Sequence, residues 1–106
     1  MAINRNDIPL QIPAQNGSGA SQDVSFCAGV SVFVSGTFTA DIQIQISPQG
    51  ISVADGQSSW FNVGAVLNAP GFVEFARAMK CRATVANYVN GTPAGAIVGT
   101  QSVSGG

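Results

Sequence analysis

The amino-acid sequence predicts an all-β protein, a small antiparallel β-sandwich of about seven or eight strands with jelly-roll or Greek-key connections. Two observations carry this prediction. Residues 37–46 alternate apolar and polar side chains without interruption, and a strand turns successive side chains to opposite faces. The other apolar runs are short and are separated by Gly, Pro, Asn and Asp, the residues that favour turns. No segment requires a helix.

The alternating segment 37–46 is the expected central strand of a half-buried sheet. Its apolar face is rich in β-branched residues, which favour strands, and a shift of one residue would turn that whole face into water. Its other face carries Thr, Asp and Gln. The residues expected on the buried face are Phe38, Ala40, Ile42, Ile44 and Ile46.

The remaining strands are expected in order along the chain. Ser35-Gly36 predicts a hairpin between the preceding strand and the central one. The long segment 78–89 keeps a period of two, with Lys80 and Arg82 on its polar face. Besides the central strand, the expected strands are 24–35, 51–53, 59–63, 72–76, 78–89 and 94–100, all within one sandwich domain over residues 24–100.

Residues 1–23 differ from the rest and predict an extended N-terminal arm followed by a Gly/Ser linker. Two prolines in this segment lack amide donors, which limits it to an edge strand or an extended arm. Two interpretations remain open: an edge strand or frayed terminus on its own domain, or an arm laid across a neighbouring subunit. The arm residues expected to bind a partner are Ile3, Ile8, Leu10 and Ile12. Residues 101–106 are expected to form a flexible tail.

The composition narrows the classes of partner. Charged residues make up 8% of the 106 residues, with four basic and five acidic side chains and a net charge of -1, against about 25% in typical soluble domains. Such a surface offers little repulsion between copies and favours association. Only Arg77, Lys80 and Arg82 fall close together, too few for a phosphate-binding surface. We expect no nucleic acid and, because no apolar run is long enough to span a bilayer, no membrane.

The two cysteines are expected to be reduced. The first twelve residues lack a basic region followed by an apolar run, so we expect no secretory signal and folding in a reducing cytoplasm. Cys27 and Cys81 are then buried thiols, with a disulfide between them as the alternative.

An enzyme is not expected. The chain has no His, which removes the usual general base and the commonest metal ligand. Its acids are scattered rather than paired as glycoside hydrolysis requires; they are Asp7, Asp23, Asp41, Asp55 and Glu74. We expect no catalytic residue, no metal and no cofactor.

Several stretches along the chain form a recognisable pattern. They are Val34-Ser35-Gly36-Thr37-Phe38, Ile42-Gln43-Ile44-Gln45-Ile46-Ser47-Pro48-Gln49-Gly50, Trp60, Ala69-Pro70-Gly71, Arg82-Ala83-Thr84-Val85 and Asn87-Tyr88-Val89-Asn90-Gly91-Thr92-Pro93. Over residues 32–99 the sequence resembles a family of small bacteriophage virion β-sandwich proteins, found as head decoration proteins, head fibres or tail accessory parts. Two features depart from the pattern: the longer segment 51–59 before Trp60, and the N-terminal arm.

The resemblance implies a non-enzymatic virion structural protein, made in the cytoplasm of the bacterial host. It favours a capsid decoration or cement subunit that forms a homo-oligomer, with a trimer favoured. Its partner would be the major capsid protein or another virion protein, with the arm as a clamp.

Two alternative functions come from other classes. The first is a glycan-binding or adhesion module of a phage tail or head fibre, with Trp60 and Tyr88 as a stacking platform or subunit contact. The second is an ordinary small interaction domain. A lone Trp in a sandwich is more often a core residue, so Trp60 is expected between the sheets. Tyr88 lies in the polar register of its strand and is expected to be exposed or at a subunit contact.

Overall fold

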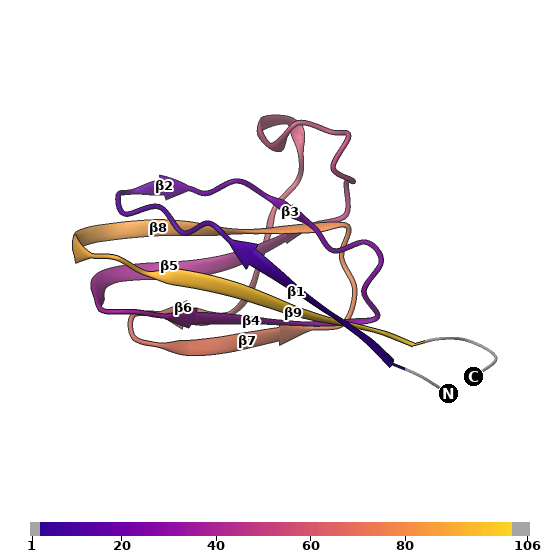
Figure 1. Ribbon diagram of the computed structural model, residues 1–106. Helices are drawn as coiled ribbons and strands as arrows, with labels where there is room; N and C mark the ends of the chain where they lie inside the picture. Colours follow the sequence, from indigo (N-terminus) through magenta and orange to yellow (C-terminus); the bar gives the residue numbers. More distant parts are fainter. Residues whose placement is uncertain (1–2, 103–106) are drawn as a thin grey trace.

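A computed structural model describes residues 3–102, and the side chains of residues 8–100. The chain forms two antiparallel sheets packed face to face (Figure 1), so the predicted all-β sandwich is confirmed. The one helical turn in this part of the chain is a short 3-10 turn, Asp55–Gln57. The strands are β1 (Ile3–Leu10), β2 (Gly17–Ser18), β3 (Gln22–Asp23), β4 (Gly29–Ser35), β5 (Phe38–Ser47), β6 (Phe61–Leu67), β7 (Gly71–Phe75), β8 (Lys80–Gly91) and β9 (Ala94–Ser102).

The strand order makes the chain cross repeatedly between the two sheets. Sheet A has the order β1-β9-β4-β7, and sheet B has the order β2-β8-β5-β6, with β3 also paired to β8. Among the described strands, β5 and β6 are the one consecutive pair that shares hydrogen bonds. The hairpin predicted at Ser35-Gly36 is therefore wrong, because β4 and β5 lie in different sheets. Crossings of this kind are those of Greek-key and jelly-roll sandwiches.

The hydrophobic core fills the space between the two sheets. β5 contributes Ala40, Ile42 and Ile44, all buried as its alternation predicted. The ends of the same face, Phe38 and Ile46, are half-buried against the core. The other core residues come mainly from β4 and β8, and they are Leu10, Val24, Cys27, Val30, Val32, Val34, Val73, Cys81, Ala83, Val85 and Ile97. Both cysteines are free and buried, as expected.

The described residues of the predicted arm and linker, 3–23, form part of the sandwich. β1 pairs along its length with β9, from Ile3 opposite Ser102 to Leu10 opposite Gly95. Leu10 is buried in the core, and Ile8 and Ile12 pack against it. The side chain of Ile3 lies outside the described side chains. Of the two interpretations, the structure has the edge strand on its own domain, because β9 offers a free edge and the core a place for Leu10.

Four further boundaries differ from those expected. The linker contains β2 and β3, which pair with β8, so the sandwich begins before residue 24. Residues 24–28 turn rather than extend, since the Cys27 amide donates to the Val24 carbonyl at 3.0 Å where the chain crosses from sheet B to sheet A. Residues 51–53 are also a turn, closed by the Val53 amide on the Gly50 carbonyl at 3.0 Å. β9 extends to Ser102; residues 103–106 of the predicted tail lie outside the described residues.

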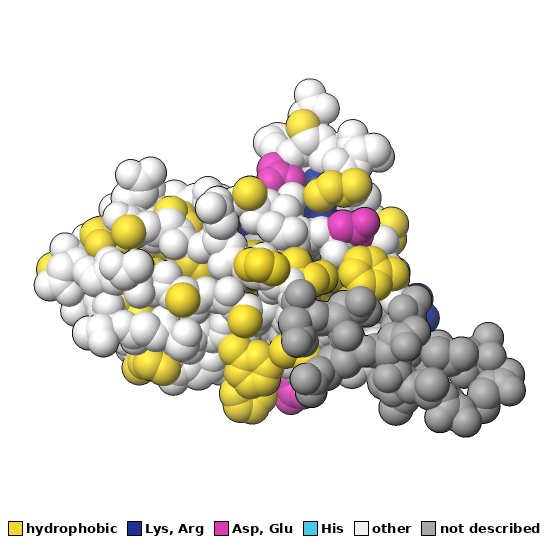
Figure 2. Space-filling model, in the orientation of Figure 1, with side chains coloured by type: hydrophobic (Ala, Val, Ile, Leu, Met, Phe, Trp, Pro, Cys, Tyr) yellow, Lys and Arg dark blue, Asp and Glu magenta, His cyan; other side chains and the backbone are white. Residues whose placement is uncertain are grey.

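The surface carries few charges. Figure 2 shows mostly uncharged side chains and backbone over the visible face, with isolated acidic and basic groups. Within residues 3–102, no helix is long and apolar enough to cross a membrane.

Replacing Leu10 by Ala tests whether β1 belongs to its own sandwich. Because Leu10 is buried at the core, Leu10→Ala is expected to lower the free energy of unfolding by about 2–4 kcal/mol, measured by chemical denaturation. Gln11→Ala, at the neighbouring exposed position, is the control and is expected to change it little. Equal stability of the two variants would show that β1 does not pack on its own core.

Candidate functional site

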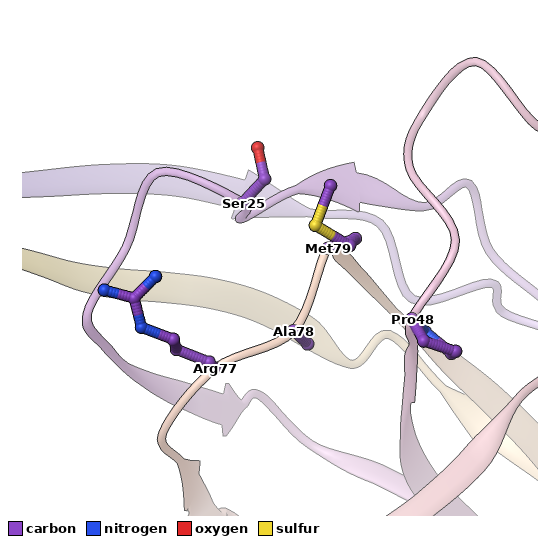
Figure 3. Close-up of a pocket in the computed structure, with 5 residues that line it drawn as sticks. All are labelled: Ser25, Pro48, Arg77, Ala78 and Met79. Carbon is purple, nitrogen blue, oxygen red and sulfur yellow. The ribbon is translucent and has the colours of Figure 1, made fainter.

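Apolar side chains gather at one end of the sandwich, where β5 and β7 end and β8 begins. Two adjoining hollows of about 350 and 280 Å3 share the lining residues Pro48, Arg77 and Ala78. Ile46, Ser47 and Phe61 complete the larger hollow, and Ser25 and Met79 complete the smaller one, whose residues Figure 3 shows on three separate stretches of chain. We call these eight residues the end cleft.

The segment 48–60 borders the end cleft through its first residue, Pro48. It leaves sheet B after β5, rises above the sheet and returns into β6 (Figure 1). It contains the stretch 51–59 that departs from the family pattern. The side chains of β8 that point outward from the core, Lys80 and Arg82, lie beneath it, in register with Ser47 and Gln45 of β5.

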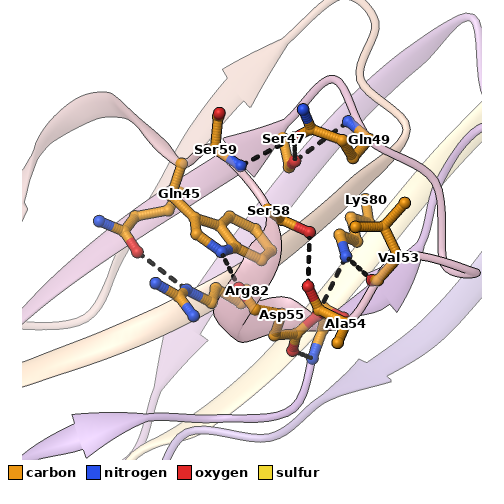
Figure 4. A network of polar contacts seen from close by, with 12 residues as sticks. Gln45, Ser47, Gln49, Val53, Ala54, Asp55, Ser58, Ser59, Lys80 and Arg82 are labelled. Carbon is orange, nitrogen blue, oxygen red and sulfur yellow. Dashed lines mark hydrogen bonds and ion pairs between the residues drawn. The ribbon is translucent and has the colours of Figure 1, made fainter.

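Lys80 is the centre of the contacts that hold this segment. Its side chain is 0% exposed, although it lies on the outer face of sheet B. The Nζ atom donates to the Val53 carbonyl at 2.6 Å and to Asp55 Oδ1 at 3.1 Å (Figure 4). A buried ammonium is costly unless it is paired and hydrogen-bonded, so closing the segment over Lys80 requires both partners.

Asp55 joins the segment to a second part of the chain. Its carboxylate accepts hydrogen bonds from the Ser21 hydroxyl at 2.7 Å and the Ser21 amide at 3.3 Å. Burial by itself would raise the pKa of Asp55, but the hydrogen bonds from Ser21 and the contact with Lys80 hold this pKa below its ordinary value of 3.8. Asp55 is therefore ionised at neutral pH and connects three separate stretches of sequence.

Trp60 packs on the cations of β8. The Arg82 guanidinium carbon lies 4.0 Å from the centre of its ring, and Lys80 Nζ lies 5.4 Å from it, both within the range of cation–π attraction. The indole Nε1 donates to the Asp55 carbonyl at 2.9 Å. Arg82 is held in turn by Gln45, whose Oε1 accepts from Nε at 2.9 Å. We call Lys80, Asp55, Trp60 and Arg82, with these partners, the clasp.

The base of the segment is closed by Gln49. Its side-chain oxygen accepts a hydrogen bond from the Ser47 hydroxyl at 3.0 Å and from the Ser59 amide at 2.8 Å (Figure 4). The backbone amide of Gln49 also donates a hydrogen bond to Ser47 Oγ at 3.1 Å. The two ends of the segment are thereby tied together beside the end cleft.

The predicted aromatic site residues do not come together as a platform. Trp60 is half-buried under the segment and is not part of the core between the sheets. The prediction of a core Trp is corrected, because Lys80 and Arg82 give the ring a place on the outer face of sheet B. Tyr88 is half-buried against the core, and its hydroxyl donates to the Gly91 carbonyl at 2.6 Å.

A bulge explains the position of Tyr88. Between Thr39 and Asp41 the register of β5 with β8 shifts, so that Thr39 faces Asn90 while Asp41 faces Ala86. Asn87 has a φ of 53°, a left-handed conformation that Asn tolerates better than most residues. The extra residues turn Tyr88 out of the polar register expected from the alternation.

The other described acids each accept hydrogen bonds from one neighbouring residue. Asp23 accepts from the Ser25 hydroxyl and amide, Asp41 from the Asn87 side chain, and Glu74 from the Ser31 hydroxyl at 3.5 Å. Within the described part of the chain, no three acids or cysteines come close enough to hold a metal ion.

Sequence reasoning missed the clasp and the end cleft. The available signal was the combination of Lys80 in an outward strand position, a lone Trp60 and an extra segment between them and β5. The contacts of Lys80 with Val53 and Asp55 join residues 27 and 25 positions apart, and the cleft combines residues from several connections. Neither is visible in a local pattern.

A double-mutant cycle tests the coupling within the clasp. Asp55→Ala leaves the Lys80 ammonium buried with one carbonyl partner, which is expected to cost about 2 kcal/mol of unfolding free energy. Lys80→Met keeps the apolar stem, and the half-buried Asp55 retains Ser21, so its cost is expected to be smaller. Adding Lys80→Met to Asp55→Ala is expected to recover stability in chemical denaturation. A double variant as unstable as the sum of both single changes would refute the coupling.

Acid is expected to release the segment. Since the folded pKa of Asp55 is lowered, its contribution to stability is complete above the ordinary value of 3.8 and is lost as the pH falls through the folded value. Fluorescence of the single Trp, Trp60, is expected to change in that acidic range, with circular dichroism as the control for global unfolding. Asp55→Asn is expected to lack the transition; an identical transition in this variant would assign the change to another group.

Comparison with known proteins identifies a similar fold. No protein-family model and no curated protein sequence matches the chain. Among solved structures, the crystal structure of the SPBc2 prophage-derived protein YomS superposes with a TM-score of 0.66, covering 92% of this chain and 95% of that chain. The sequence identity is 14%. The two chains therefore share a fold over nearly their whole lengths.

Proposed function

We propose that this chain is a non-enzymatic structural subunit of a bacteriophage particle. Within that class we propose a decoration or cement protein that binds the head lattice and associates with copies of itself, as a trimer. The proposal rests on one observation above all: the outer face of sheet A carries an exposed apolar row.

This face has an apolar row that crosses all four strands. Pro9 lies opposite Ala96, Ala96 opposite Phe33, and Phe33 opposite Phe72. Phe33 and Phe72 are 43% and 55% exposed, and their ring centres lie 5.5 Å apart. An exposed apolar surface on a folded protein marks a site that another surface covers. Aromatic residues also supply much of the binding energy at protein interfaces.

The charges of this face suit a repeating lattice. On β7, the acidic side chain of Glu74 lies on the same face as Phe72, and it contacts Ser31 of β4. With a net charge of -1 for the whole chain, repulsion between neighbouring copies is small. Contacts that are individually weak add up when one subunit touches several neighbours in a symmetric particle.

The shared fold with YomS supports a phage origin. That protein is described as prophage-derived, and the family resemblance of residues 32–99 points to the same source. The glycan-binding alternative has less support. Arg82 covers one face of the Trp60 ring, and the Tyr88 hydroxyl is bonded within its own chain.

The composition of purified particles tests the proposal. In particles of the phage that encodes the chain, quantitative mass spectrometry is expected to find it in fixed proportion to the major capsid protein. Replacing Phe33 and Phe72 together by Ser is expected to reduce its occupancy about tenfold, and Val66→Ser, an exposed apolar position on β6, is the control. Absence of the chain from particles would contradict the proposed function. Unchanged occupancy of the double variant would contradict the role of sheet A.

A further inference from the structure

The end cleft is apolar but has one cation at its rim. Phe61 is 58% exposed and Met79 40% exposed, which are large apolar surfaces to leave in water. Arg77 lies between the two hollows. Lys80–Asp55 is the one ion pair among the side chains of residues 8–100, so Arg77 has no acidic partner among them.

Arg77 differs from Lys80 and Arg82, whose charged groups have partners within the chain. Lys80 is buried against Val53 and Asp55, and Arg82 is held by Gln45 and Trp60. Both are used inside the chain. Among the side chains of residues 8–100, no acid pairs with the guanidinium of Arg77, and its planar set of donors matches a carboxylate.

We propose that the end cleft binds an extended segment of a neighbouring protein that carries two apolar side chains and a carboxylate. The two hollows receive the apolar side chains, and Arg77 pairs with the acid. An extended segment fits because residues i and i+2 of a strand point the same way, and the two hollows adjoin along the shared residues Pro48, Arg77 and Ala78.

The clasp gives the cleft a fixed shape. Pro48 begins the segment 48–60 and Phe61 directly follows it. Gln49 ties the two ends of the segment together through Ser47 and Ser59. A binding site that is already formed loses less conformational entropy when its ligand binds. The buried Lys80 therefore serves the cleft through the segment that it holds, whose two ends adjoin the lining residues Pro48 and Phe61.

The test uses isotope-labelled full-length protein and synthetic peptides. The probe is acetyl-Asp-Leu-Thr-Leu-Thr-amide, which has leucines at i and i+2 and one carboxylate; the comparison peptide has Lys in place of Asp. Saturable amide shifts in NMR spectra are expected at Gln49, Ala78 and Met79, with a Kd of about 1 mM. The Lys peptide is expected to bind at least about fivefold more weakly.

Variants identify the site. Arg77→Gln is expected to weaken the binding of the Asp peptide about fivefold and to remove the preference for it over the Lys peptide. Phe61→Ser is expected to weaken the binding of both peptides. Phe72 is a similarly exposed aromatic residue on sheet A, and Phe72→Ser is expected to leave the binding of both peptides unchanged. No saturable shifts up to about 5 mM, equal binding of the two peptides, or an unchanged Phe61→Ser variant would overturn the proposal. Decanoate binding more tightly than the Asp peptide would also overturn it, in favour of an amphiphile site.

The inference rests on the proposed function only in taking the neighbour to be another particle protein. Peptide binding is measured without particles, so the two can fail separately. Particle association without peptide binding would remove the cleft proposal. Peptide binding by a chain that is absent from particles would remove the proposed function.

Discussion

The pairing of β5 with β8 is the contact on which both halves of the structure depend. From Ile42 opposite Val85 to Ser47 opposite Lys80, the two strands keep one register, and the period of two divides their side chains. One face supplies Ile44 and its neighbours to the core. The other face presents Lys80 and its neighbours to the segment 48–60. A shift of one residue would exchange the two faces and remove the core and the clasp together.

The clasp places a cost in the structure that the sandwich itself does not need. Burying a lysine costs free energy that an apolar residue would avoid, and β8 would pair with β5 without it. The cost is offset at a defined place, where Val53, Asp55 and Trp60 hold an added segment on sheet B. The segment held in this way adjoins the end cleft at Pro48 and Phe61. The clasp therefore connects the stability of the sandwich to the shape of its proposed binding surface.

The sequence predicted the features that depend on local pattern. The alternation of residues 37–46 identified β5, its buried face and the sandwich class. It did not identify which strands share a sheet, because turn residues such as Ser35-Gly36 allow both a hairpin and a crossing between sheets. It could not place Tyr88, since the bulge at Asn87 depends on pairing with β5. The clasp depends on contacts between segments that are distant in the sequence. The local pattern therefore identified Lys80 only as a residue on the polar face of a strand.

Amide hydrogen exchange of residues 49–59 tests most directly whether the segment is held on sheet B. The amides of Val53 and Gln57 donate to Gly50 and Ala54 within the segment. If the clasp holds the segment closed, these amides exchange much more slowly than in an unstructured chain, and Lys80→Ala accelerates them while the β5 amides stay protected. Exchange at the unstructured rate in the unaltered protein would contradict the account.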